Sequence, residues 1–186
     1  MFEQTGMAGL LVFTPPRHGD DRGFFSETWS ERAFTELGLG FGWVQDNHSY
    51  SREPGVLRGL HYQAPPMSQA KLVRCTRGRI WDVAVDVRPG SPTFGQWHGL
   101  ELSADNWKQF LVPRGFLHGF VTMAPDTEVQ YKVDQPYSPE HDGAVIWNDP
   151  ELAIEWPLTD APTLSAKDAG APLFANWTNP FKEERR

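Results

Sequence analysis

The segment "GVLRGLHYQ", residues 55–63, combines the pattern of a buried strand with two ionisable side chains. Its apolar residues suit a pleated, half-buried surface. Arg58 and His61 do not, because burying an ionisable group is costly unless the group is paired. His61 is therefore a satisfied core histidine, a metal ligand or a catalytic base, and the segment alone leaves all three open.

Spacing adds a constraint on this segment. Arg58 and His61 lie three residues apart, so on a regular strand their side chains point to opposite faces. If both reach one substrate, the strand must bulge or twist near Gly59, since glycine tolerates such geometry. The alternative is that the long Arg58 side chain reaches round the strand edge. We expect a backbone irregularity at Gly59.

Two segments resemble the motifs of cupins, which are double-stranded β-helix barrels of the jelly-roll type. "PRGFLH" supplies the second motif with Pro113, Gly115 and His118. In the first motif, His61 follows Gly55 at the expected distance, but glutamine stands at position 63 in place of the second histidine, and no glutamate follows. Metal-binding cupins use three or four histidine and carboxylate ligands. The resemblance supports the barrel and predicts no metal centre.

A longer set of segments resembles the dTDP-4-dehydrorhamnose 3,5-epimerase family, a metal-free cupin branch. The segments run in the family's order from residue 20 to residue 168: "DDRGFFSETW", "VQDNHSYS", "GVLRGLHYQ", "KLVRC", "DVAVDVRPGSPTFGQW", "VPRGFLHGF", "VQYK", "YSPEHDG", "WNDPELAIEWP" and "LSAKD". The resemblance implies an enzyme that needs no cofactor.

Epimerisation beside a ketone needs a base for the acidic α-proton, a group that stabilises the enolate, and an acid on the opposite face of the ring. The resemblance assigns the base to His61, its orienting carboxylate to Asp168 and the proton donor to Tyr131. Lys71 would stabilise the developing enolate oxygen electrostatically.

The resemblance also implies the residues that hold the dTDP-sugar. Arg22 and Arg58 would grip phosphate or sugar oxygens, and Tyr137 would stack on the thymine ring. The remaining substrate contacts would come from Glu27, Gln45, Asn47, His118, Asp142 and Lys167. The segment with Arg22 and Glu27 crosses to the partner subunit in the family, so the resemblance implies a homodimer.

Two positions depart from the family's pattern, and one contact goes beyond it. Asp142 stands where the family often has glutamate, and Leu117 replaces a smaller residue before His118; either could alter the substrate fit. On the expected strand 79–87, Asp82 lies on the face opposite the stripe from Trp81 to Val87. We hypothesise that Asp82 hydrogen-bonds His118 and fixes its ring.

The elements that must position these residues are mostly strands. One helix is expected, with Thr28 and Glu31 as a capping box and Gly38 at its end. Strands are expected at 10–13, 41–50, 56–63, 71–75, 79–87, 96–102, 109–113, 118–123 and 128–133. Turn signals such as "RPGSP" and "PRG" separate them. This pattern predicts a mainly β, cupin-type jelly-roll barrel or sandwich with few short helices.

We expect one domain over residues 1–186, with a core at about 10–147 and an irregular C-terminal segment, 148–186, packed on it. The net charge of −7 argues against a general nucleic-acid binder. No apolar run approaches the roughly 20 residues that span a membrane. The single cysteine, Cys75, and an N-terminus unlike a signal peptide predict the cytoplasm.

Four functions fit these features. The leading one is an isomerase that inverts carbons 3 and 5 of dTDP-4-dehydro-6-deoxy-D-glucose to give dTDP-4-dehydro-L-rhamnose. The nearest alternative is an epimerase of a single carbon, from a deoxysugar or antibiotic pathway. A non-catalytic cupin that binds a nucleotide sugar and a metal-dependent cupin oxygenase are the others.

Overall fold

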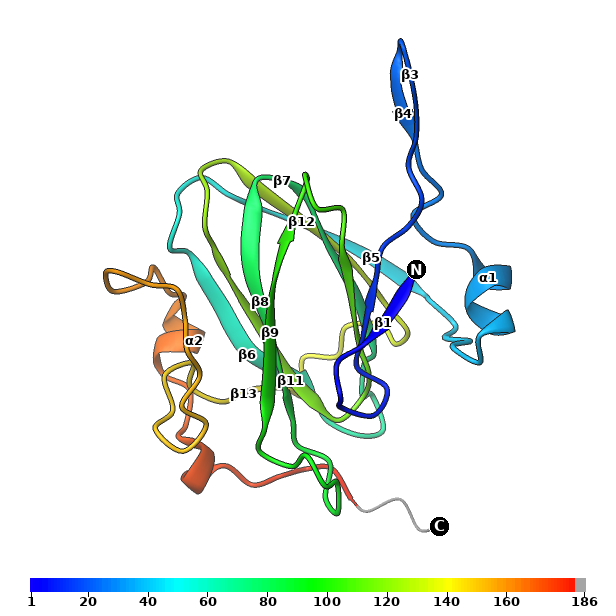
Figure 1. The fold of residues 1–186 in the computed structure, drawn as a ribbon. Coiled ribbons are helices and arrows are strands. Elements are labelled where there is room, and N and C mark those ends of the chain that lie inside the picture. The colour runs from blue at the N-terminus through cyan, green and yellow to red at the C-terminus, as the bar shows by residue number, and fades with distance from the viewer. Residues whose placement is uncertain (183–186) are drawn as a thin grey trace.

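A computed structural model describes residues 1–182 of the 186-residue chain, and two antiparallel sheets form its centre (Figure 1). In spatial order, the six-stranded sheet consists of β1 (Phe2–Gln4), β2 (Leu11–Phe13), β10 (Gln109–Val112), β7 (Lys71–Arg77), β12 (Thr127–Val133) and β5 (Gln45–Ser51). The five-stranded sheet consists of β13 (Asp142–Ala144), β6 (Leu57–Gln63), β11 (Phe116–Thr122), β8 (Arg79–Asp86) and β9 (Trp97–Ser103). The predicted mainly β, cupin-type jelly roll is confirmed.

A separate hairpin of β3 (His18–Asp20) and β4 (Gly23–Phe25) projects away from the two sheets (Figure 1). Each of the nine expected strands overlaps an observed one, with shifted ends. The largest shift is at 41–50, where the strand begins only at Gln45 because Phe41 and Trp43 pack beside the helix. The three-residue strands β1, β3, β4 and β13 were not expected, since such short segments carry little periodicity.

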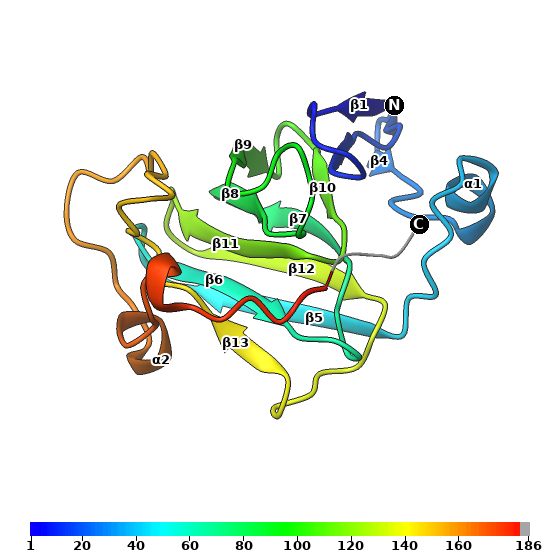
Figure 2. The same ribbon diagram turned by 90° about the horizontal axis from the view of Figure 1, so that it is seen from below.

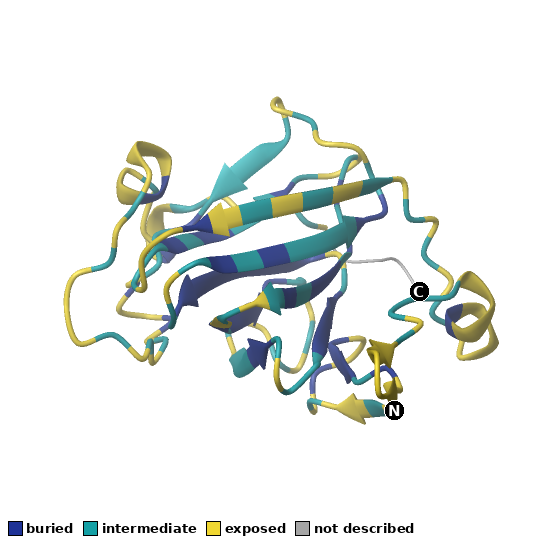
Figure 3. Ribbon diagram, turned by 90° about the horizontal axis from the view of Figure 1, so that it is seen from above, coloured by how far each residue is buried: buried dark blue, intermediate teal, exposed yellow. Residues whose placement is uncertain are grey.

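The core alternates across the sheets as the strand period requires. Between the sheets lies one apolar cluster, to which β8 contributes Ile80 and Ala84. The opposite face of β8 contributes Val83 and Val85 to a second cluster, which the C-terminal segment covers with Leu152, Phe174 and other side chains. Figure 3 shows this burial on the central strands, whereas the hairpin is exposed.

The helix α1 (Glu31–Glu36) begins later than the capping box predicts, so that prediction is wrong. Ser30 is the N-cap, and its side chain makes no capping hydrogen bond. Thr28 stays with the barrel instead, because its backbone oxygen accepts a hydrogen bond of 2.8 Å from Gln109 Nε2. Gly38 ends the helix as expected, with a φ of 72° and its N–H bonded to the oxygen of Thr35.

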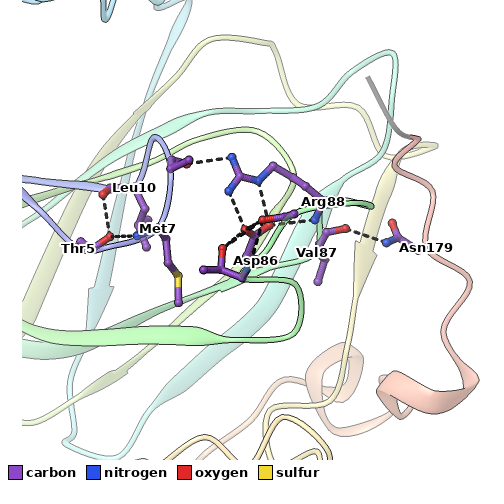
Figure 4. A network of polar contacts seen from close by, with 10 residues as sticks. Thr5, Met7, Leu10, Asp86, Val87, Arg88 and Asn179 are labelled. Atoms are coloured by element: carbon purple, nitrogen blue, oxygen red, sulfur yellow. Dashed lines mark hydrogen bonds and ion pairs between the residues drawn. The ribbon is translucent and has the colours of Figure 1, made fainter. Parts of the chain in front are cut away.

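The C-terminal segment is mostly irregular, with a short helix α2 (Ala166–Ala169) and a 3-10 turn at Phe174–Asn176. It runs beside β6 and β13 (Figure 2). Its far end is tied to the barrel by Asn179, whose Nδ2 donates to the oxygen of Val87 at 2.8 Å (Figure 4). These contacts agree with a single domain, which stays a prediction. Within residues 1–182, none of the helices is long and apolar enough to cross a membrane.

An ion pair at the end of β8, with a buried carboxylate, is also hydrogen-bonded to the N-terminal loop (Figure 4). Asp86 is fully buried and accepts hydrogen bonds from Arg88, Ser91 and Thr93. Burial alone would raise the pKa of Asp86, but these hydrogen bonds hold it below its usual range. The Arg88 guanidinium also donates to the oxygen of Ala8 at 2.9 Å, so one carboxylate organises two loops.

Candidate active site

The inner face of the five-stranded sheet presents the two histidines side by side. His61 on β6 pairs with His118 on β11, and His118 pairs in turn with Ala84 of the inner core cluster. One pair further along, Arg58 lies opposite Phe120, which lies opposite Asp82. Because directly paired residues share a face, these side chains all point between the two sheets.

An extra residue in β6 brings Arg58 and His61 to the same face. The pairs His61–His118 and Arg58–Phe120 leave two β6 residues, Gly59 and Leu60, opposite the single Gly119. The expected irregularity at Gly59 is therefore confirmed as a bulge, and Gly59 has a φ of 136°, which glycine adopts most readily.

Backbone contact at the bulge is close. A Cβ atom on Gly59 would lie 2.5 Å from the Cα of Gly119 and 2.9 Å from the oxygen of His118. There is no room for a side chain at either glycine, because a Cβ atom there would push the two strands apart.

His61 is hydrogen-bonded to a carboxylate from the far end of the chain. Its Nε2 bonds to Asp168 Oδ1, and Asp168 is 3% exposed on α2. Burial alone would raise the pKa of Asp168, but hydrogen bonds from His61 and Ser165 hold it below the usual range. An ionised carboxylate only accepts, so Nε2 carries a proton and Nδ1 is the ring nitrogen that is left to act as a base. This arrangement gives His61 the geometry of an oriented base.

The hypothesised contact between Asp82 and His118 is present. Asp82 Oδ1 lies 2.8 Å from His118 Nε2, and both residues are buried. Burial lowers the pKa of His118 even though Asp82 acts to raise it, so the ring is neutral near pH 7. Nε2 therefore donates to the carboxylate, and Nδ1 is left as an acceptor. Within residues 1–182 the other carboxylate oxygen of Asp82 has no hydrogen-bond partner.

The six-stranded sheet places Lys71 and Tyr131 on the facing surface. Lys71 lies on the same face of β7 as Val73 and Cys75 of the inner cluster, and Tyr131 packs against that cluster from β12. Desolvation lowers the pKa of Lys71 to about 8, although the charges of Asp82 and Asp142 raise it. Desolvation also raises the pKa of Tyr131, against the nearby charge of Arg58. Tyr131 is thus a protonated phenol at neutral pH.

Gln45 and Asn47 share this inner surface on the edge strand β5, where they pair with Val133 and Tyr131. Gln45 Nε2 donates to Asn47 Oδ1 at 2.9 Å, and Gln45 Oε1 accepts the N–H of Tyr137 at 3.1 Å. Gln45 therefore holds the loop that carries Tyr137.

Asp142 joins two further predicted site residues. Its Oδ2 accepts a hydrogen bond of 3.0 Å from the Tyr137 hydroxyl and another from Lys167 Nζ. The bond to Asp142 raises the pKa of Tyr137, whose side chain is otherwise largely exposed. Since Lys167 precedes Asp168 on α2, the carboxylate of Asp142 connects the Tyr137 loop to the element that holds the base.

Arg22 and Glu27 are not brought to this cluster within the chain. Both are exposed at the projecting hairpin (Figure 1), and there Arg22 is paired with Asp20. The Arg22 side chain is 89% exposed. Leu117 also lies elsewhere, because it belongs to the cluster under the C-terminal segment. Leu117 thus points to the opposite face from His118, and its expected effect on the substrate fit, which stays a prediction, would be indirect.

Sequence reasoning missed two supporting residues. Ser165 caps α2 by accepting the N–H of Asp168 at 3.1 Å, and its hydroxyl donates to Asp168 Oδ2 at 2.8 Å. The Ser-x-x-Asp spacing in "SAKD" resembles a capping box and could have indicated it. Gln63 accepts the N–H of Ser138 and donates to the oxygens of Pro136 and Met67. Within residues 1–182, no cluster of three or more histidine, cysteine or carboxylate side chains is arranged to hold a metal.

Known proteins resemble this chain over most of its length. The family model described as dTDP-4-dehydrorhamnose 3,5-epimerase matches residues 4–176. The enzyme of that name from Pseudomonas aeruginosa is 54% identical over 168 residues, which is 90% of this chain and 92% of that protein. This chain belongs to the dTDP-4-dehydrorhamnose 3,5-epimerase family.

Two solved structures place the chain within the epimerase family. The dTDP-6-deoxy-D-glucose-3,5-epimerase of Legionella pneumophila, crystallised with dTDP-4-keto-L-rhamnose, is 42% identical, with a TM-score of 0.95 over 100% of this chain and 99% of that one. A 3'-monoepimerase from Streptomyces bikiniensis, crystallised with dTDP-quinovose, is 34% identical, with a TM-score of 0.86 over 94% of this chain and 88% of that one.

The bulge predicts the effect of one methyl group in this epimerase. Gly59→Ala should destabilise the fold by about 3 kcal/mol, because its Cβ would collide with Gly119 and the left-handed backbone disfavours alanine. The fraction of Gly59→Ala that folds should have lower activity, because a β6 strand without the bulge would turn Arg58 to the opposite face from His61. Urea unfolding and a steady-state assay measure both effects.

Gly42→Ala is the matched control, because beyond the adjoining residues no atom would lie within 4 Å of a Cβ at this position. It should change stability by less than about 0.5 kcal/mol. Wild-type stability and activity in Gly59→Ala would show that the bulge does not depend on glycine.

Proposed function

We propose that this chain epimerises carbons 3 and 5 of dTDP-4-dehydro-6-deoxy-D-glucose to give dTDP-4-dehydro-L-rhamnose. The observation that carries the proposal is the placement of proton-transfer groups on opposed surfaces. The His61–Asp168 pair comes from the five-stranded sheet and α2, and Tyr131 comes from the facing sheet. A sugar ring held between the sheets would present one face to a base and the other to an acid.

Proton removal is the role of His61. Its free Nδ1 takes the proton on a carbon next to the C4 ketone, and Asp168 stabilises the imidazolium that forms. Tyr131, which desolvation keeps protonated, returns a proton from the opposite face and inverts the carbon.

Enolate stabilisation is the role of Lys71. Carbons 3 and 5 both flank C4, so both carbanions place their charge on the same oxygen. One cation beside that oxygen therefore serves both inversions. Asp82 and Asp142 favour the charged form of Lys71, and His118 offers a neutral acceptor nearby for a sugar hydroxyl.

The nucleotide would be held by the outer part of the same surfaces. Arg58 and Lys167 supply cations for the diphosphate. Tyr137 presents a largely exposed ring for the thymine. Gln45 accepts a hydrogen bond from the backbone N–H of Tyr137, and Asp142 accepts one from its hydroxyl. Asn47 beside Gln45 would complete the thymidine end.

Inversion of both carbons is favoured over inversion of one. The chain is 42% identical to the 3,5-epimerase of Legionella over its whole length and 34% identical to the Streptomyces 3'-monoepimerase. The residues proposed for proton transfer serve either outcome, so the number of carbons that exchange is the quantity to measure.

We further propose that the enzyme works as a homodimer in the cytoplasm. The hairpin projects from the sheets (Figure 1) and carries Arg22 and Glu27 away from the chain's own site. It also exposes Phe24 and Phe25, at 52% and 71%. Exposed aromatic residues on a projecting hairpin suit burial against a second copy. In such a dimer each hairpin would deliver Arg22 to the partner's substrate.

Deuterium incorporation tests the reaction directly. In deuterated water the product should carry deuterium at both carbon 3 and carbon 5, read by NMR. His61→Asn should lower exchange at both carbons by about 10³-fold, while dTDP binding by calorimetry is retained. Tyr131→Phe should still exchange the substrate proton yet fail to invert the carbon.

His48→Asn is the matched control, because His48 pairs with Glu128 on the outer face of β5. It should exchange at the wild-type rate. Deuterium at one carbon only would refute the double epimerisation, and unchanged exchange in His61→Asn would refute the base.

The pKa of Lys71 predicts an alkaline limb. Because desolvation lowers this pKa to about 8 in the free enzyme, the cation is lost as pH rises through 8, and kcat/KM should fall by half near that pH. Tyr131 does not titrate there, since its pKa is raised. Lys71→Met should lower kcat/KM by about 10²-fold or more and remove the limb, whereas Lys71→Arg should shift the limb upward. A limb that persists unchanged in Lys71→Met assigns it to another group.

Mixing two impaired variants tests the dimer, at a substrate concentration low enough that Arg22→Ala alone turns over slowly. Arg22→Ala retains His61, and His61→Asn retains Arg22. If Arg22 acts on the partner's site, each mixed dimer has one intact site, so random exchange should restore about a quarter of full activity. If Arg22 serves its own chain, or the enzyme is a monomer by sedimentation, mixing restores nothing.

A further inference from the structure

The projecting hairpin, which we term the arm (residues 17–27), is anchored only at its base. Its tip makes few contacts with the barrel: the Arg22 side chain is 89% exposed and Phe25 is 71% exposed. A two-stranded hairpin has little stability of its own in water. The direction of the arm must therefore be set where it leaves the barrel.

At that base, the Arg17 guanidinium lies against two aromatic rings. Its Cζ is 4.2 Å from the ring centroid of Phe24 and 4.8 Å from that of Trp107. The two rings meet edge to face, with centroids 5.0 Å apart and planes at 80°. Phe24 belongs to the arm and Trp107 to the loop between β9 and β10. The three side chains thus form a cation–π clamp between arm and barrel.

Hydrogen bonds tie both ends of the arm to the same loop. The Trp107 indole Nε1 donates to Ser26 Oγ at 3.1 Å, and Ser26 Oγ donates to the oxygen of Pro16 at 2.7 Å. Two residues further on, Gln109 donates to the oxygen of Thr28 at 2.8 Å. The chain therefore enters and leaves the arm against residues 107–109.

The loop holds Trp107 in an unusual conformation. Its φ is 61°, in the left-handed region that an aromatic residue rarely adopts. Asn106 supports it by accepting the N–H groups of Ser103 and Lys108 and by donating to the oxygen of Glu101. Strain of this kind persists only where the surroundings enforce it. Here it turns the indole toward the arm.

We propose that Trp107 and Arg17 are positioning residues that set the direction of the arm and so place Arg22 at the substrate of the partner subunit. This rests on the proposed dimer. A clamp at the base fixes the arm before the partner arrives, so little ordering remains to be done on assembly or on substrate binding. Neither side chain touches the groups proposed for proton transfer.

Trp107→Gly separates the clamp from the loop, because glycine accepts the positive φ while the indole is removed. Amide hydrogen exchange in residues 18–25 should become about tenfold faster, and exchange in β7 and β12 should not change. KM should rise about fivefold with kcat within twofold of wild type, as for a lost binding contact. Phe94→Ala, an exposed aromatic on a different loop, should leave both readouts unchanged.

A double variant tests whether Trp107 acts through the arm. Trp107→Gly added to Arg22→Ala should raise KM no further than Arg22→Ala alone. Multiplied KM effects, unchanged exchange in the arm of Trp107→Gly, or faster exchange with unchanged KM would each overturn the proposal. If Arg22→Ala itself leaves KM unchanged, the role of Arg22 in the proposed function fails, and exchange in the arm then decides the clamp alone.

Discussion

The one-residue bulge in β6 organises the candidate site. Two residues, Gly59 and Leu60, face the single Gly119 of β11, and this shift turns Arg58 onto the face that already carries His61. The strands can approach this closely because glycine stands on both sides; a Cβ on Gly59 would lie 2.5 Å from the Cα of Gly119. Without the extra residue, strand alternation would send Arg58 or His61 into the apolar cluster beneath the C-terminal segment.

A histidine between two sheets needs a hydrogen-bond partner for its ring N–H, and the fold supplies a carboxylate to each of the two histidines. His118 is hydrogen-bonded to Asp82 on the neighbouring strand. His61 is hydrogen-bonded to Asp168, which lies 107 positions further along the chain. Each carboxylate accepts a hydrogen bond from the Nε2–H of its histidine, so that Nδ1 faces away from the carboxylate. The apolar packing that holds the C-terminal segment against the outer face of the sheet is therefore also what keeps a carboxylate on His61.

Gln63 illustrates how a position changes its use within a fold. It stands where the cupin motif has its second histidine, yet its amide makes three hydrogen bonds to backbone groups of Met67, Pro136 and Ser138. Those bonds hold the loop that presents Tyr137. An amide suits this task because it donates and accepts at once, which an ionised carboxylate does not. The position that holds a metal-binding histidine in the cupin motif therefore supports, in this chain, the loop proposed to bind the nucleotide.

Much of this protein followed from sequence. Strand alternation and turn residues are local, so nine strands and the two faces of β8 were predictable, and the face of Asp82 led to its contact with His118. Motif order identified His61, Lys71, Tyr131 and Asp168 as a group that the fold then brought onto facing surfaces and α2. Tertiary structure alone decided which residue starts α1, that Leu117 faces away, that Gln63 supports the site, and that Trp107 clamps the arm. Each of these depends on which distant segment packs beside the residue, and the spacing of side chains along one strand does not specify which strand or loop that is.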